Sequence, residues 1–389
     1  MAEEIVRIAA RGDGVTASGR HAAFAVPGDL LRDDGTVEAG AHHQAAPCRH
    51  FPECGGCQLQ HADDIVFAGY LMSRVEGALA QHGLATEIRE PHLSPPLSRR
   101  RATLRALKAG KRAVIGFNAE KSHQIVDMRE CHILRPELFA LIAPLRALLA
   151  SLLQPRRTAE VQLTLVDQGA DLLLKGVAAE ELSAIERLTG FATDHRLARM
   201  GIDQGFGAET LYEPEPATIT LAGAAVAFPQ GGFLQATRDG EQALVSSVCD
   251  ALGDSRAIAD LFAGLGTFAL ATGAGYAAEA SRDSAAALKQ AAPGTAVEHR
   301  DLYRRPLDAA ELKSFDAVIL DPPRAGAAEQ VAQLAGSTVE RVAYVSCNPA
   351  TFARDAKVLV DGGYELLWIK PVGQFRWSTH VELAACFAK

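Results

Sequence analysis

One cysteine near the C-terminus occupies a position where it could act as a nucleophile. Cys347 stands where the apolar run 342–346, with the pattern of a buried strand, meets Asn348-Pro349, a helix cap followed by a first-turn proline. The unpaired amides and the positive dipole end of the helix favour a thiolate at such a corner. A buried, inert cysteine is the alternative, and the other motifs of the chain weigh against it.

A carboxylate on the last apolar segment of the chain is a candidate general base. Glu382 lies in the segment 379–383, which has the pattern of a strand. Partial desolvation there would raise the pKa of the carboxyl group, as a base that works near neutral pH requires. A surface carboxylate on an edge strand is the alternative.

Upstream motifs predict the sheet that would position these groups. The strand-like run 257–262, which ends at Phe262, leads into a glycine turn with Gly264 and Gly266, and a helix follows. This order is typical of the first loop of a doubly wound nucleotide-binding sheet, where glycines let the backbone approach an adenosyl ligand. Glu279, after the next strand-like run, is placed to accept hydrogen bonds from ribose hydroxyls, and Asp301 follows the third, where such folds address the adenine.

A further strand-like run, 315–320, ends in Asp321-Pro322-Pro323. The two prolines stop both the strand ladder and a helix, and they leave the Asp321 carboxylate at the carboxyl edge of the sheet. Ligands bind outside that edge in open α/β sheets. We therefore expect Asp321 at the same site as the glycine turn.

Four motifs in order carry a resemblance to a known family. They are DLFAGLGTF at 260–268, DPPRAG at 321–326, YVSCNPATFARD at 344–355 and THVELAACF at 379–387. Together they resemble the motifs of the RNA uridine-5-methyltransferases, which use S-adenosylmethionine to make 5-methyluridine in tRNA or large-subunit ribosomal RNA. The resemblance covers most of the chain.

The resemblance implies a covalent mechanism and a set of roles. Cys347 would add to C6 of uracil, the resulting enolate would attack the sulfonium methyl group, and Glu382 would remove the C5 proton before the thiolate leaves. Asp321 would contact the uracil edge. The segment 233–237 resembles the family's entry motif, whose glutamine contacts the cofactor, and Thr237 stands where asparagine is more usual. The expected cofactor-binding residues are Gln235, Phe262, Gly264, Gly266, Glu279, Asp301 and Asp321.

Four of the seven cysteines form a set: Cys48, Cys54, Cys57 and the distant Cys131. The local spacing is C-x5-C-x2-C, and Gly55-Gly56 lets the chain wrap so that three sulfurs can converge. In a reducing compartment such spacing indicates metal binding more often than disulfides, and four thiolates suit either zinc or a [4Fe-4S] cluster. The resemblance favours the [4Fe-4S] cluster, because the cysteine segments are similar to the family's cluster-binding pattern.

A basic stretch lies between the third and fourth of these cysteines. Residues 98–112 hold seven Lys or Arg side chains, alternating with apolar residues as a strand would, and no acidic residue. A solvated face is the bland interpretation, and contact with RNA phosphates is the one we prefer. The expected RNA-binding residues are Arg99, Arg100, Arg101, Arg105, Lys108 and, in the DPPRAG motif, Arg324.

Length and composition are those of a globular enzyme. The chain has 389 residues, 48% hydrophobic and 22% charged, which predicts two or three domains. The net charge of -8 argues weakly against nucleic acid, but a local basic face matters more than the total. We expect a cytoplasmic monomer, since the first residues lack a signal segment and no apolar stretch approaches the roughly 18 to 20 residues of a membrane span.

The predicted architecture is an α/β protein in three parts. Residues 1–40 alternate short strands with glycine turns, and they match either a reduced form of the RNA-binding TRAM barrel found in the resembled family or a β-extension packed on the next domain. Residues 41–227 form an α+β central domain with the cysteine set, and residues 228–389 form the Rossmann-like methyltransferase domain.

The predicted function is formation of 5-methyluridine in structured RNA, with 23S rRNA as the preferred target and tRNA as the alternative. An exocyclic-amine methyltransferase would use an Asp/Asn-Pro-Pro-aromatic motif, but residue 324 is Arg and Cys347 would have no role. A non-catalytic RNA-binding factor is the remaining alternative, and the presence of both Cys347 and Glu382 argues against it.

Overall fold

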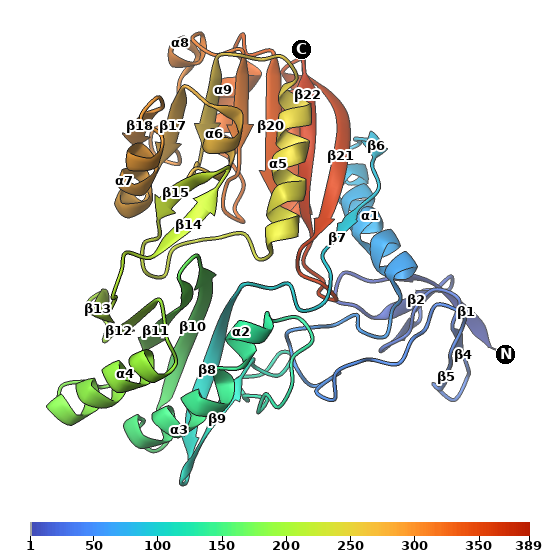
Figure 1. The fold of residues 1–389 in the computed structure, drawn as a ribbon. Helices are drawn as coiled ribbons and strands as arrows, with labels where there is room; N and C mark the ends of the chain where they lie inside the picture. The colour runs from blue at the N-terminus through green and yellow to red at the C-terminus, as the bar shows by residue number, and fades with distance from the viewer. Residues whose placement is uncertain (1) are drawn as a thin grey trace.

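The structure, a computed structural model, describes residues 2–389. Figure 1 shows a small N-terminal sheet, a central sheet with its helices, and a C-terminal α/β body that holds the end of the chain. None of the helices in residues 2–389 combines the length and the apolar composition that crossing a membrane requires.

The N-terminal part is an antiparallel sheet with the strand order β3-β2-β1-β4-β5. Its strands are β1 (Glu3–Ile8), β2 (Gly14–Thr16), β3 (His21–Ala22), β4 (Leu30–Leu31) and β5 (Val37–Glu38). It has a small core around Ile5 and Leu31, while Ile8 and Val26 pack into the same cluster as Leu59 of the following segment. The sheet is therefore joined to the rest of the protein through its core.

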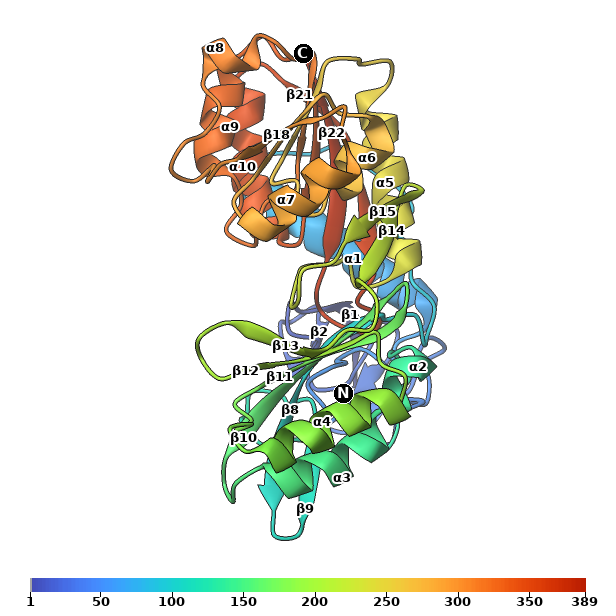
Figure 2. The ribbon, with the colours of Figure 1, turned by 60° about the vertical axis from the view of Figure 1, so that its left-hand side comes forward.

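The central sheet has the strand order β13-β12-β11-β10-β8-β9. Its elements are β8 (Arg101–Ala109), β9 (Arg112–Gly116), α2 (Pro136–Phe139), α3 (Ile142–Leu152), β10 (Thr158–Val166), β11 (Gly169–Lys175), α4 (Leu182–Asp194), β12 (Arg199–Asp203) and β13 (Ala208–Tyr212). Alternate residues of β8, such as Leu104, are buried against the helices, which cover one face (Figure 2). The residues between them, among them Thr103 and Arg105, belong to the opposite face.

The C-terminal body is a doubly wound sheet with the strand order β18-β17-β16-β19-β20-β22-β21-β6. Its strands are β16 (Ile258–Leu261), β17 (Tyr276–Glu279), β18 (Ala296–His299), β19 (Ala317–Leu320), β20 (Arg341–Ser346), β21 (Glu365–Gly373) and β22 (Glu382–Ala388). Its helices are α5 (Arg238–Leu252), α6 (Thr267–Thr272), α7 (Arg282–Ala291), α8 (Ala309–Leu312), α9 (Ala328–Ala335) and α10 (Pro349–Asp361).

Two hydrophobic clusters lie on opposite faces of this sheet. Leu244 of α5 and Phe268 of α6 pack with Ile319 of β19 on one face. Phe352 of α10 packs with the neighbouring strand residue Leu320 on the other. The inner strands β16, β19 and β20 are buried on both faces, so they have mostly apolar sequences, as expected for parallel strands between helices. This confirms the predicted doubly wound α/β fold.

Parts of the expected central domain belong instead to the C-terminal body. Helix α1 (Asp64–Ala80) packs in the cluster that includes α10, and β6 (Glu87–Ile88) and β7 (His92–Leu93) pair with β21. The hairpin of β14 (Thr218–Leu221) and β15 (Ala224–Ala227) also packs against α7. The expected boundaries at residues 41 and 227 therefore differ from the packing, because these segments cover the edge and the rim of the sheet.

Candidate active site

A large cavity lies at the carboxyl edge of the parallel strands, between the C-terminal sheet and the central sheet. It has a volume of about 2310 Å³ including its open mouth. The glycine turn, Glu279, Asp301, Asp321, Cys347 and Glu382 all line it, although they are spread over more than a hundred residues of sequence. The structure therefore brings together the residues that the motifs single out for cofactor binding and for chemistry.

The glycine turn after β16 uses its two glycines for different purposes. A Cβ atom on Gly264 would meet no atom within 4 Å, so this side of the turn faces open space, and a Cβ atom on Gly266 would lie 2.2 Å from Leu288 Cδ1. Both glycines have positive φ angles, +56° and +89°, and Phe262 has +65°. A left-handed phenylalanine is a strained conformation, and such strain is concentrated at functional sites.

Acidic side chains hold the turn and the far end of the cavity. Glu279 accepts hydrogen bonds from the backbone amides of Gly264 (2.8 Å) and Ser281 (2.6 Å). Each carboxylate oxygen keeps acceptor capacity for a ligand hydroxyl. Asp301 accepts a hydrogen bond from the Tyr303 amide (3.0 Å), and the Tyr303 ring lies 5.6 Å from the ring of Phe262. Tyr303 also lines the cavity, and no sequence motif pointed to it.

Cys347 stands at the strand-to-helix corner that the sequence predicted. It follows β20, and the Asn348 side chain caps α10 by accepting a hydrogen bond from the Ala350 amide (3.1 Å). Burial, together with the nearby carboxylates of Glu382 and Asp321, raises the pKa of the Cys347 thiol to about 11. The sequence predicted that the helix end favours a thiolate, whereas burial and the two acids favour the thiol.

Glu382 is the first residue of β22, which lies between β20 and β21 inside the sheet and not at its edge. Its side chain is buried. Burial raises the pKa of the Glu382 carboxyl to about 8, with a further contribution from Asp321, while Gln374 and Arg101 act in the opposite direction. The direction of this shift is the one that the apolar segment predicted.

Two glutamines connect the acids of the site. Burial raises the pKa of Asp321 to about 7, and Gln235 Nε2 lies 3.4 Å from Asp321 Oδ2. Gln374 Nε2 donates to Gln235 Oε1 (2.8 Å), and Gln374 also lowers the pKa of Glu382. Gln374 lies at the end of β21, where no motif marked it, and only the pairing of β21 with β22 could have placed it beside Glu382.

The basic stretch divides between the interior and the open face. Arg100 is buried, and its guanidinium donates to Glu241 (2.6 Å) and to the Gln235 carbonyl (3.0 Å). This corrects the expected phosphate contact of Arg100, because the guanidinium is already engaged in the interior. Burial lowers the pKa of Arg101 to about 10, and its guanidinium lies 4.4 Å from the ring centre of Phe233 at the cavity wall.

The other predicted RNA contacts occupy different places. Arg99 lines the cavity and lies over Phe375 (5.3 Å), and Arg324 also lines the cavity. Arg105 is exposed on β8, whereas Lys108, farther along the strand, does not line the cavity.

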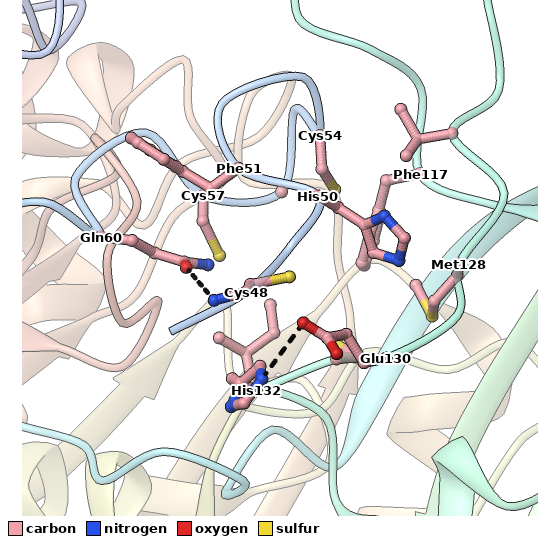
Figure 3. Close-up of a pocket in the computed structure, with 14 residues that line it drawn as sticks. Cys48, His50, Phe51, Cys54, Cys57, Gln60, Phe117, Met128, Glu130 and His132 are labelled. Carbon is pink, nitrogen blue, oxygen red and sulfur yellow. Dashed lines mark hydrogen bonds and ion pairs between the residues drawn. The ribbon is translucent and has the colours of Figure 1, made fainter. Parts of the chain in front are cut away.

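The four cysteines of the predicted set line one separate cavity of about 420 Å³ including its mouth. Figure 3 shows Cys48, Cys54 and Cys57 around this space with apolar neighbours such as Phe117 and Met128. Gln60 accepts a hydrogen bond from the Cys48 amide (3.1 Å). A Cβ atom on Gly55 would lie 2.8 Å from the Asn118 carbonyl oxygen, so the close wrapping of this loop requires a glycine there.

The arrangement of the cysteines does not match a site for a single metal ion. Tetrahedral zinc needs sulfurs about 3.8 Å apart, given a Zn–S bond of about 2.3 Å. Within residues 2–389, no group of three or more His, Cys, Asp or Glu side chains is placed to hold a metal ion. The four thiols line one cavity with apolar neighbours.

A doubly wound sheet with a glycine turn, an acid after the second strand and a large cavity at the carboxyl edge is the arrangement of S-adenosylmethionine-dependent methyltransferases. The family described as tRNA (Uracil-5-)-methyltransferase matches residues 278–389. An RNA methyltransferase of Zymomonas mobilis is 51% identical over 395 residues, covering 100% of both chains. The 23S rRNA (uracil(1939)-C(5))-methyltransferase RlmD of Yersinia enterocolitica is 32% identical over 366 residues, covering 87% of this chain and 80% of the relative. The chain therefore belongs to the family of S-adenosylmethionine-dependent RNA uracil-C5 methyltransferases.

A solved structure agrees with the fold. The tRNA (uracil-54, C5)-methyltransferase of Pyrococcus abyssi, solved in complex with S-adenosyl-L-homocysteine, superposes with a TM-score of 0.76. It is 22% identical in sequence, and the match covers 100% of this chain and 99% of that one. The likeness extends over all parts of the chain, including the N-terminal sheet.

Proposed function

We propose that the enzyme forms 5-methyluridine in 23S rRNA by covalent catalysis through Cys347. The observation that carries the proposal is the convergence of Cys347, Glu382 and Asp321 on one cavity with the glycine turn. The relative of Yersinia enterocolitica, named for 23S rRNA, supports the ribosomal target over 87% of this chain. tRNA is the alternative target, since the family description and the Pyrococcus structure are named for tRNA.

The part of the cavity near the glycine turn fits S-adenosylmethionine. The open space beside Gly264 admits a ligand close to the backbone, Glu279 would accept the ribose hydroxyls, and Asp301 with Phe262 would lie along the adenine. The cofactor supplies an electrophilic methyl group on a positively charged sulfonium. Gln235 is engaged with Gln374 and Asp321, so we assign it to holding Asp321 in place beside the cofactor.

At the other part of the cavity the residues would activate uracil. The Cys347 sulfur adds to C6, which makes C5 nucleophilic, and Asp321 contacts the polar edge of the ring. After C5 has accepted the methyl group, Glu382 takes the C5 proton, the C5–C6 double bond forms again, and the thiolate leaves. The balance is one proton to Glu382 and one methyl group to uracil.

The raised pKa values suit the order of these steps. Three acids in one buried space disfavour their charged forms, so the cavity without ligands holds Cys347 as a thiol and Glu382 largely protonated at neutral pH. A positive charge brought into the cavity lowers the pKa of each acid. Thiolate and carboxylate would therefore form when the charged cofactor is present, which limits side reactions of the free enzyme.

We further propose that Cys48, Cys54, Cys57 and Cys131 hold a [4Fe-4S] cluster. The four thiols share one apolar cavity, and burial raises the pKa of Cys57 to about 12. Positively charged iron would compensate thiolates that are costly to form in such surroundings. Protein purified without oxygen should be brown and contain iron and acid-labile sulfide in near-equal amounts. Purified protein that contains zinc and no acid-labile sulfide would refute this proposal.

Glu382→Gln tests the covalent mechanism, because the loss of the base blocks only the last step. Addition and methyl transfer should proceed, so an RNA adduct on Cys347 with the transferred methyl group accumulates. Turnover should fall by about 10²- to 10⁴-fold. Denaturing gels with labelled cofactor should show a shifted, methyl-labelled band that is absent from the Cys347→Ala, Glu382→Gln double variant. Near-normal turnover, or a stalled enzyme without the band, would assign proton removal to another residue.

The target is tested separately. Total RNA from a deletion strain is methylated in vitro with labelled cofactor, and the labelled nucleotide is mapped. Label at a uridine of 23S rRNA is the expected result, and label in tRNA would select the alternative.

A further inference from the structure

A groove lies beside the catalytic cavity on the open face of the central sheet. It has a volume of about 720 Å³ including its open mouth. Thr103 and Arg105 of β8 line it together with Gly55 of the cysteine loop and the segment 117–121. Gly55 and Phe117 line both the groove and the catalytic cavity, so the two spaces are adjacent.

The wall of the groove is held in place by backbone hydrogen bonds between distant parts of the chain. The Gly55 amide donates to the Asn118 carbonyl (3.0 Å), and the Glu120 amide donates to the Glu53 carbonyl (3.2 Å). The other side is a strand of a sheet, paired through Arg105 with Glu160 of β10. Both sides are therefore formed before any ligand arrives.

The groove carries positive charge on both of its sides. The Arg105 side chain is 48% exposed and contacts Glu160 through one nitrogen (3.2 Å). The Lys121 side chain is 65% exposed and contacts Glu120 (3.0 Å). Exposed ion pairs of this kind contribute little, so a phosphate can replace the carboxylate partner of either cation. Phe117 supplies an aromatic wall where the groove meets the cavity.

A uridine that reacts in the cavity must be turned out of its stack, and the adjacent backbone then crosses the mouth of the cavity. Proteins recognise such unstacked nucleotides with cations for phosphates and aromatic rings for bases. Resting on the proposed function, we propose that this groove binds the nucleotide adjacent to the target uridine. Its phosphate lies between Arg105 and Lys121, and its base lies toward Phe117.

The test compares two pairs of charge-removing substitutions from the same region. Arg105→Gln with Lys121→Gln removes the cations of the groove. Lys111→Gln with Arg112→Gln removes the same charge from the exposed turn between β8 and β9, which lies far from the C-terminal body (Figure 1). The probes are a single-stranded RNA heptamer with one central uridine and two shorter RNAs that end at the uridine on its 5′ or 3′ side. Equilibrium binding is measured for each, so the result does not depend on turnover.

The groove variant should bind the heptamer and one of the shorter RNAs at least roughly tenfold more weakly, because both cations that contact the phosphate are lost. The other shorter RNA lacks the nucleotide in the groove, so its affinity should stay within about twofold, and the turn variant should bind all three RNAs nearly as the wild type does. Equal weakening of both shorter RNAs, or equal effects of the two variants, would show general electrostatic attraction and overturn the proposal. Unchanged binding of every RNA by the groove variant would mean that the groove does not bind the RNA, and it would also overturn the proposal.

Two further measurements separate this proposal from the proposed function. Thr103→Trp fills the groove from an exposed strand position, and it should weaken the same two RNAs while the affinity for S-adenosylmethionine stays unchanged. If the wild type binds the RNAs with the predicted pattern but transfers no methyl group to uridine, the proposed function fails and the groove stands. If the wild type methylates uridine and the binding pattern is absent, only the proposal for the groove fails.

Discussion

The catalytic cavity and the cysteine cavity share Phe117 and Gly56 in their walls, yet they are assembled in opposite ways. In the catalytic cavity, Cys347 and Asp321 each follow the carboxyl end of a strand in one sheet. The sheet places such residues together whenever the strands pair. The cysteine cavity lies between loops, and its four cysteines meet only because distant loops pack against each other.

The two cavities are joined by one segment, the loop between β21 and β22. The amides of Gln58 and Leu59 both donate to the Trp377 carbonyl (2.8 Å each). The Trp377 ring packs against Cys57 and Ile133. The same loop supplies His380 to the wall of the catalytic cavity and leads into Glu382. The cysteine loop therefore supports part of the active site, and substitutions can show how strongly.

The largest difference is expected between two cysteines of similar exposure. Cys347→Ala should reduce methyl transfer by roughly four to six orders of magnitude, as loss of a nucleophile does, and it should leave iron content and melting temperature unchanged. Cys131→Ser should lower iron content and melting temperature together, and activity should fall only as folded protein is lost. Metal analysis, thermal unfolding and single-turnover kinetics are measured on both variants. A Cys131→Ser protein with full iron content would contradict the role of the quartet.

The pH dependence should come from the catalytic cavity. The cofactor has lost its positive charge once the methyl group is transferred, so the raised pKa of Glu382, about 8, applies to elimination. The basic form is then scarce at pH 6, and elimination should speed up about tenfold per pH unit until it levels off above pH 8. Rates are measured from pH 6 to 9 with saturating substrates. Cys347→Ser would abolish the reaction and give no pH profile. Glu382→Asp keeps a carboxylate, so it is the informative control. Its profile of rate against pH should remain bell- or sigmoid-shaped with a shifted midpoint. A flat wild-type profile would contradict the assignment.

The same raised pKa has the opposite effect on stability. The folded protein holds the Glu382 proton more tightly than the unfolded chain, so this contribution is present below the unfolded pKa and is lost as the pH rises through about 8. Glu382→Gln removes the dependence. The melting temperature of the variant should therefore rise relative to that of the wild type between pH 6 and pH 9. A constant difference across this range would mean that the carboxyl group is not protonated in the folded cavity.

The two glycines of the turn separate ligand binding from packing. Both have positive φ, so alanine at either position costs about 1 kcal/mol of backbone strain. Gly266→Ala would also press against Leu288, which should add roughly 1 to 3 kcal/mol to the loss of stability. Gly264→Ala should remain folded and weaken cofactor binding instead. Thermal unfolding and cofactor titration of both variants check this contrast, and equal losses of stability would refute it.

The smallest effect is expected at the contact between the cavities. Trp377→Phe should lower kcat a fewfold and loosen metal retention, because the ring packs against Cys57 beside the loop that carries His380. Trp368→Phe is the matched control, since this buried ring lies on β21 under Arg89 and lines neither cavity. Turnover and iron content are compared in the two variants. Identical behaviour would mean that the cavities are independent.

The sequence alone determined the parts of this protein in which chemistry follows local order. The glycine turn, Glu279, Asp321 and the corner at Cys347 each follow a strand-like run, and parallel strands bring their carboxyl ends to one edge. The doubly wound fold and the family followed from the same motifs. The position of Glu382 on an apolar segment also predicted the direction of its pKa shift, because burial of a carboxyl group disfavours its charge.

Only the tertiary structure decided what depends on partners that are distant in sequence. Arg100 and Arg105 lie in one basic run, but Glu241 draws the first into the interior while the second faces the groove. The pKa of Cys347 is raised first by burial and then by Glu382, which β22 brings beside it. Helix α1 packs on the C-terminal sheet because an apolar helix face packs wherever the fold offers an uncovered apolar surface. Periodicity and spacing in the sequence describe a single helix or strand. The charge and packing between two such elements depend on which elements come into contact.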